Sequence, residues 1–155
     1  MSESRELVEI LKSKNLKFSC AESFTGGGLA SAIISVSGAS AVFHEGIVAY
    51  SNEAKTERLK VKAETLEKYK PVSKEVASEM LDGITDNCDV AVSTTGLAGP
   101  SSDESGFEVG LCFIGVSVNG KKEIYKFNLE GDRTSVINQG IDLAISLTLE
   151  NLRRI

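Results

Sequence analysis

A short stretch with a serine and a run of glycines holds the side chains best suited to chemistry. Apolar segments precede and follow residues 23–28, and this pattern indicates a strand, a tight turn and a helix. Ser23 could be a nucleophile exposed at the end of the strand. The turn, with Thr25, Gly26 and Gly27, could instead bind an anion through free amides at the start of the helix. A third interpretation is that Ser23 or Thr25 only caps the helix.

A nucleophilic serine needs a proton acceptor, and the chain offers few. His44 is the only histidine and lies in a strand-like run. Lys55 follows the end of that run at the start of a predicted helix, where the helix dipole and burial both lower the pKa of an amine. A neutral lysine beside a serine is a known general base. Tyr50 ends the same strand. The alternatives are that Lys55 is a solvated surface lysine and that Tyr50 is a core aromatic residue with an exposed hydroxyl group.

Two further segments carry candidate ligand-binding groups. Thr95 and Gly96 follow a second predicted buried strand, so Thr95 could cap a helix or contact a ligand. Arg133 stands just before the long C-terminal helix. Its forked donors could hold a phosphate, or it could pair with an acidic neighbour at the surface.

Composition excludes several classes of function. The net charge is −5 and there is no basic block, which argues against extended binding to nucleic acid. No apolar run is long enough to span a membrane and the first residues do not form a signal peptide, so we expect a cytoplasmic protein. A single histidine argues against a zinc site, and we expect neither a metal nor a redox cofactor.

The three cysteines are an odd number at wide spacing, at positions 20, 88 and 112. Each lies in an apolar run, which predicts buried thiols in a reducing compartment rather than a disulfide framework. A nucleophilic Cys20 is a weaker alternative to Ser23.

Helical and strand patterns alternate along the chain. The spacing of apolar residues and the turn signals predict helices over 3–14, 25–35, 53–59, 63–69, 74–86 and 134–153, and strands over 16–21, 42–50, 89–93, 109–118 and 123–129. This order predicts one α/β domain over residues 1–155, a three-layer α/β/α sandwich with a mixed sheet of about five strands. Ligands of such sheets bind beyond the carboxyl ends of strands, where the loops at 22–28, 50–55 and 94–100 could meet.

Taken together, the motifs resemble the carboxy-terminal domain of the competence/damage-inducible CinA family, also known as the nicotinamide-nucleotide amidohydrolase (PncC) family. The likeness runs from about Leu7 to Leu152. The matching segments, in chain order, are Ala21 to Gly27, Gly38 to Phe43, Gly46 to Lys55, Val72 to Ala77, Thr95 to Pro100 and Gly131 to Arg133.

The resemblance implies the same α/β/α fold and hydrolysis of nicotinamide mononucleotide to nicotinic acid mononucleotide and ammonia, a step of pyridine nucleotide salvage. By the family's pattern Ser23 matches the nucleophile, Lys55 the base and Tyr50 its helper. Thr25, Gly26, Gly27, Thr95, Gly96 and Arg133 match the substrate site. The partner implied is therefore a small nucleotide, and homo-oligomer formation is left open.

The chain departs from the family at the loop after Pro100, where serines replace a glycine pair, and at Glu108, where proline is common. It also has Ile137 where a second arginine is common. These differences leave open an alternative function, a non-catalytic module that binds a nucleotide or phosphate.

Overall fold

A five-stranded mixed sheet forms the centre of the computed structural model, which describes residues 1–102 and 105–155. The strand order is β2-β1-β3-β4-β5. The strands are β1 (Phe18–Glu22), β2 (Phe43–Val48), β3 (Val90–Gly96), β4 (Leu111–Val118) and β5 (Lys121–Asn128). The first three run parallel, and β4 and β5 are antiparallel to their neighbours. The carboxyl ends of β1, β2 and β3 therefore meet at one edge of the sheet.

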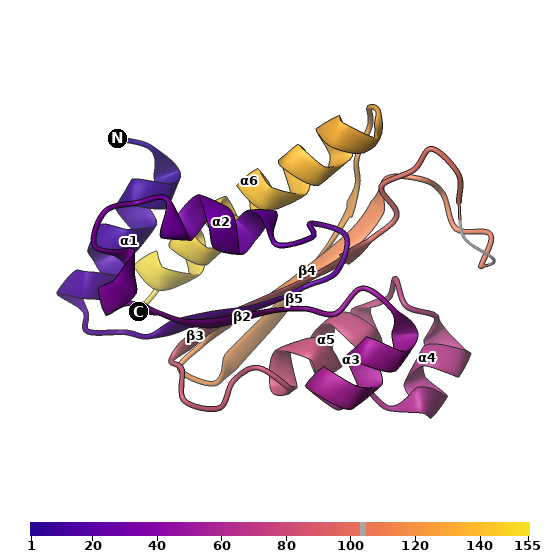
Figure 1. The fold of residues 1–155 in the computed structure, drawn as a ribbon, viewed down its shortest axis with the longest axis horizontal. Helices are drawn as coiled ribbons and strands as arrows, with labels where there is room; N and C mark the ends of the chain where they lie inside the picture. The colour runs from indigo at the N-terminus through magenta and orange to yellow at the C-terminus, as the bar shows by residue number, and fades with distance from the viewer. Residues whose placement is uncertain (103–104) are drawn as a thin grey trace.

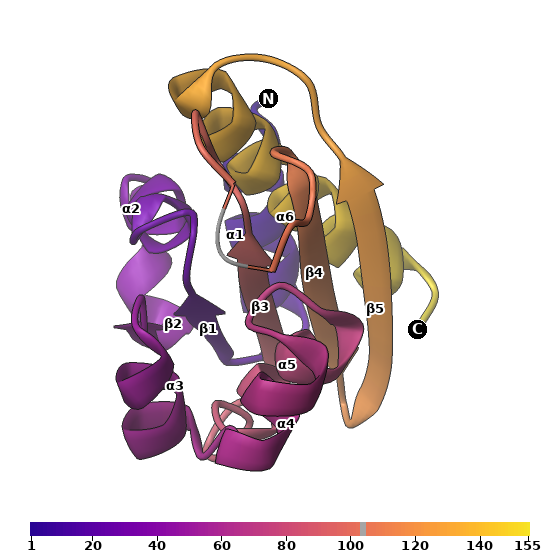
Figure 2. The same ribbon diagram turned by 90° about the vertical axis from the view of Figure 1, so that its right-hand side faces the viewer.

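Helices cover both faces of this sheet, as Figures 1 and 2 show. One layer holds α1 (Glu3–Ser13), α2 (Gly28–Ile34) and α6 (Arg133–Arg153). The other holds α3 (Asn52–Leu59), α4 (Ala63–Tyr69) and α5 (Lys74–Asp82), and a short 3-10 helix spans Ala39–Ala41. The predicted α/β/α sandwich with a mixed five-stranded sheet is confirmed.

Each helical layer packs its apolar residues against one face of the sheet. Phe18 and Leu29 belong to the buried cluster under α1, α2 and α6, and Met80 and Leu81 to the cluster under α5. Burial of such side chains is the main force that holds the layers together. Every residue of β1 and every residue of β3 except Gly96 is buried, because helices cover both faces of these strands.

Serine side chains cap the starts of two helices. Ser51 accepts a hydrogen bond from the Ala54 amide, and Ser73 accepts one from the Val76 amide. By contrast, α2 begins three residues later than predicted, and α5 ends four residues earlier. Within the described part of the chain, none of the helices has both the length and the apolar character needed to cross a membrane.

Candidate active site

Ser23 follows directly after β1, in the middle of the edge where the parallel strands end. Its amide continues the ladder by donating to the Thr94 carbonyl oxygen at 3.0 Å. On the other side the Ala49 amide donates to the Glu22 carbonyl oxygen at 2.9 Å. Ser23 is 6% exposed, and its hydroxyl group forms no hydrogen bond with any described residue. The backbone of Ser23 is thus fixed on both sides while the hydroxyl group remains free to react.

The turn after Ser23 uses its glycines for backbone geometry. Gly26 and Gly27 have positive φ angles of 58° and 95°, which L side chains rarely adopt. The N-cap residue of α2 is Gly27, and the helix has no hydrogen bond from an N-cap side chain. The interpretation that Ser23 or Thr25 caps α2 is therefore wrong.

The amides at the start of α2 are already bound, by a residue that the sequence analysis did not single out. The Glu22 carboxyl group accepts hydrogen bonds from the Leu29 amide at 2.8 Å and the Ala30 amide at 3.0 Å. The expectation that the first helix amides are free for an anion is wrong for these two. Free amides remain earlier in the turn, because those of Phe24, Thr25 and Gly27 have no acceptor among the described residues.

Lys55 lies on the inner side of α3, where only 2% of it is exposed. Its Nζ atom donates to the Tyr50 carbonyl oxygen at 3.2 Å, and it forms no ion pair with any described residue. Burial lowers the pKa of this amine from 10.5 to about 8. Tyr50 directly follows Ala49 and Ser23 directly follows Glu22, and these two preceding residues are hydrogen-bonded to each other. The Tyr50 carbonyl group that Lys55 contacts and Ser23 therefore lie at the carboxyl ends of two adjacent strands.

The strand register excludes His44 as a base for Ser23. Val48 is paired with Glu22, and the Ala49 amide is bonded to the Glu22 carbonyl oxygen, so Ser23 lies level with the end of β2. His44 is exposed near the start of β2, and five residues of strand correspond to about 16 Å.

Arg133 bridges the two loops that flank Ser23. Its guanidinium group donates to the Tyr50 hydroxyl oxygen at 3.1 Å and to the Gly99 carbonyl oxygen. Tyr50 follows β2, Gly99 follows β3, and β1 lies between these strands. The guanidinium group therefore lies across the carboxyl end of β1, and these two hydrogen bonds use only some of its N–H donors.

Thr25 and Thr95 are buried, and their hydroxyl groups have protein partners. Thr25 contacts Glu22 Oε1 at 2.6 Å and Thr94 Oγ1 at 2.8 Å. Thr95 donates to the Pro71 carbonyl oxygen at 2.8 Å. Both hydroxyl groups therefore hold the walls of the site, and their predicted contacts with substrate remain predictions.

Phe24 fixes the residue next to Ser23 from the apolar side. Its ring lies between two glycines, since a Cβ atom placed on Gly96 would lie 2.9 Å from it and one placed on Gly140 only 2.5 Å. Phe24 packs with Ala98, Cys112 and Val136, and Ile137 packs against this cluster. The side chain of Ile137 therefore contributes to the apolar core beneath the turn.

We expect Gly140→Ala to destabilise the protein although it lies within α6. Alanine favours a helix by about 0.8–1.0 kcal/mol, but crowding a packed core costs about 1–3 kcal/mol. The new methyl group would push on the Phe24 ring, so the melting temperature should fall. Asn138→Ala, at an exposed position of the same helix, should not lower it. A more stable Gly140→Ala protein would show that the space around Phe24 is loose.

The Cys20 thiol is not a competing nucleophile. The residue is completely buried, and burial together with the nearby Glu22 carboxylate raises the pKa of the thiol. Reactive cysteines are instead partly exposed and have a lowered pKa. All three cysteines are free thiols. Among the described residues, no group of three or more histidine, cysteine or acidic side chains is placed to hold a metal ion.

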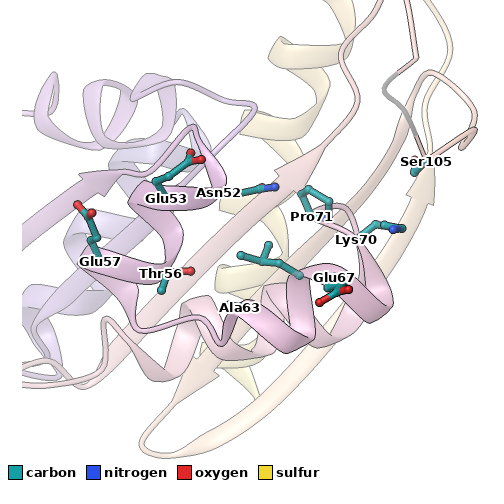
Figure 3. A pocket seen from close by; sticks show the side chains of 10 residues that line it. Asn52, Glu53, Thr56, Glu57, Ala63, Glu67, Lys70, Pro71 and Ser105 are labelled. Carbon is teal, nitrogen blue, oxygen red and sulfur yellow. The ribbon is translucent and has the colours of Figure 1, made fainter.

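A pocket of about 760 Å³ lies between α3 and α4 (Figure 3), and Lys55 is not among its lining residues. Glu53, Glu57 and Glu67 line it, and Lys70 is the one cationic side chain among the described residues that line it. Neither Ser23 nor Tyr50 belongs to its lining. Three carboxylates would repel a phosphate, so an anionic ligand is better served by the strand ends, where Arg133 lies. Of the polar loop predicted after Pro100, residues 103 and 104 lie outside the described residues.

A serine hydroxyl without a hydrogen-bond partner among the described residues, and a buried lysine that contacts the residue after the neighbouring strand, define the class of site. It is a candidate Ser-Lys site on an α/β/α sandwich. The family profile "CinA C-terminal domain" matches residues 2–152, and the chain belongs to this family.

Proteins of similar sequence have names that refer to the same family. A CinA-like protein of Kosmotoga olearia is 47% identical over 141 residues, which cover 90% of this chain and 34% of that protein. One from Fusobacterium nucleatum is 52% identical over 126 residues, which cover 81% of this chain and 31% of that protein. The chain thus spans about a third of the length of these curated relatives.

Solved structures share the whole fold. A competence-damaged protein (CinA) superfamily protein of Klebsiella pneumoniae has a TM-score of 0.95 and 30% identity, with 99% of this chain and 97% of that chain covered. The competence/damage-inducible protein CihA of Agrobacterium tumefaciens has a TM-score of 0.89 and 30% identity at the same coverage.

Proposed function

We propose that the chain hydrolyses the carboxamide of nicotinamide mononucleotide, giving nicotinic acid mononucleotide and ammonia. The observation that carries this proposal is the state of Lys55. A buried amine with a pKa of about 8 and no carboxylate partner in the described chain is partly neutral near physiological pH. A neutral amine can accept a proton, and the free hydroxyl group of Ser23 lies at the same strand ends.

The proposed reaction has two stages. Neutral Lys55 removes the proton from the Ser23 hydroxyl group as the Ser23 oxygen attacks the carboxamide carbon. The resulting oxyanion is stabilised by the unpaired amides of Phe24, Thr25 and Gly27. Protonated Lys55 then gives its proton to the departing amine, and ammonia leaves an ester on Ser23. Lys55 next takes a proton from water, which attacks the ester and releases the acid with the proton returned to Ser23.

The Arg133 guanidinium group supports a substrate with a phosphate group. It has unused N–H donors above the end of β1, where a ligand bound at Ser23 would extend into solvent. A guanidinium group suits phosphate because its fork of donors matches the oxygen geometry. Tyr50, which Arg133 contacts, forms the adjacent wall, and it is proposed to assist the proton transfers of Lys55.

The direct test measures ammonia release from nicotinamide mononucleotide, with nicotinamide riboside as the substrate that lacks the phosphate. We expect release from the mononucleotide and much less from the riboside. Binding of the mononucleotide by calorimetry without any ammonia release would instead support the non-catalytic binding module.

We expect Arg133→Ala to raise KM for the mononucleotide about tenfold, since a hydrogen bond to a charged group contributes about 1.5–3 kcal/mol. The effect on kcat should be smaller, because Arg133 does not contact the reacting atoms. Arg153→Ala, at the exposed far end of α6, is the matched control and should leave KM unchanged. An unchanged KM in Arg133→Ala would remove Arg133 from the phosphate site.

A further inference from the structure

Glu22 is a buried acidic residue that ends β1 and directly precedes Ser23. It is 1% exposed and forms no ion pair with any described residue. Its carboxyl group contacts only groups that can donate: the Leu29 and Ala30 amides, the Thr25 hydroxyl group and, at 3.8 Å, the Cys20 thiol. The amides at the start of α2 therefore take the place of a cationic partner.

A directed chain of hydrogen bonds runs from this carboxyl group to the amide of Ser23. Each threonine hydroxyl group has one proton. Thr25 gives its proton to Glu22 Oε1, so the hydrogen bond between Thr25 and Thr94 must be donated by Thr94. The oxygen of Thr94 is then left to accept, and it does so from the Ser23 amide at 3.2 Å. The acceptor at Glu22 fixes the direction of every bond in the chain.

We propose that Glu22 is a positioning residue for the reaction at Ser23. Its carboxyl group closes the start of α2 and directs the Glu22–Thr25–Thr94–Ser23 hydrogen-bond chain. Two consequences follow for the site. The turn is held so that the free amides of Phe24, Thr25 and Gly27 keep one arrangement, and no substrate oxygen can use the amides of Leu29 or Ala30. This inference rests on the proposed function.

The variant Glu22→Gln tests the direction of these bonds with almost no change of shape. A glutamine has one oxygen and one NH2 group, so in either orientation the NH2 group faces a backbone amide donor. We expect kcat to fall about 100-fold with KM within about twofold, because a displacement of about 1 Å at a reacting group has effects of this size. Phosphonylation of Ser23 by a fluorophosphonate, followed by mass spectrometry, should slow in parallel.

Thr94 gives a second pair of variants in case Glu22→Gln folds poorly. Thr94→Val keeps the shape and removes the hydroxyl group, so kcat should fall. Thr94→Ser keeps the hydroxyl group and should restore most of kcat. A residue with a merely structural role would not separate these two variants by kcat at equal melting temperature.

Glu79→Gln is the matched control. The Glu79 carboxyl group also accepts from an amide, that of Lys62, and from a hydroxyl group, that of Thr65, but Glu79 belongs to α5 and binds the start of α4 rather than that of α2. This variant should keep wild-type kcat and labelling. If Glu22→Gln and Thr94→Val also keep them while the wild type is active, the positioning role is overturned and the proposed function stands. A wild type that neither releases ammonia nor becomes labelled overturns the proposed function, and the positioning role with it.

Discussion

Ser23→Ala is expected to reduce ammonia release from nicotinamide mononucleotide by about three orders of magnitude or more, as loss of a nucleophile does in other hydrolases. Folding should hardly change. The Ser23 hydroxyl group forms no hydrogen bond with the described residues, so its removal leaves no partner unpaired. We expect a stability change within about 0.5 kcal/mol, which is usual for a substitution that disrupts no such feature. Binding of the mononucleotide should also persist.

Ser93→Ala is the matched control, because it shows the opposite behaviour. Ser93 is completely buried in β3, and its hydroxyl group donates to the Ala77 carbonyl oxygen at 2.8 Å. Losing this bond leaves a buried acceptor unpaired, at a cost of about 1–3 kcal/mol of stability. Turnover should be kept at temperatures where the variant is folded. If folded Ser23→Ala protein retains turnover, Ser23 is not the nucleophile.

Acyl-enzyme formation gives a second measure of the same assignment. In the wild type, the peptide that contains Ser23 should gain the mass of the acyl group when the reaction is quenched during turnover. Ser23→Ala should show no such adduct at any time. An adduct on another residue would move the chemistry away from the turn after β1.

Sequence patterns predicted the layers of this fold because those patterns are local. The serines at 51 and 73 precede helices in the usual capping position, and both caps are present. Apolar runs predicted β1 and β3 for the same reason. Boundaries were less accurate where a tertiary contact decides them. The late start of α2 is set by the Glu22 carboxyl group, which binds two of its amides, and by the left-handed backbone at Gly27.

The contacts that assemble the candidate site could not be predicted from sequence, since they join distant segments. Arg133 and Tyr50 are 83 residues apart, and their contact depends on α6 beginning above the ends of β2 and β3. In the sequence Glu22 only ends an apolar run, and the one signal of its role is that a glutamate directly precedes a serine turn and a helix. Whether Lys55 is solvated or buried also depends on α3 packing onto the sheet.

Replacement of Lys55 by methionine or arginine should remove most of the turnover. Neither Lys55→Met nor Lys55→Arg can supply a neutral amine, because methionine has none and a guanidinium group does not lose its proton in this range. Both variants should therefore lose about three orders of magnitude in kcat or more. In the wild type, kcat/KM should rise with pH and reach half its maximum near pH 8, where the Lys55 amine is half neutral.

Replacing Lys55 by methionine should lower activity but should not lower the stability of the fold. The pKa of Lys55 is about 8 in the folded chain and 10.5 in a free lysine, so the unfolded state binds more protons between these values. Below pH 8 the cost of burying the charged amine is fully present, and it is relieved as the pH rises toward 10.5. At pH 7, Lys55→Met should therefore melt no lower than the wild type, and its advantage should shrink by pH 10.

Lys74→Met is the matched control, since Lys74 begins α5 but is exposed. It should leave the rate, its pH profile and the melting temperature unchanged. A fully active Lys55→Arg would show that Lys55 acts only through its charge, as a ligand-binding cation. In that case Lys55 is better explained as a residue that binds the phosphate of the substrate, because a guanidinium group can hold an anion but cannot remove the proton from Ser23.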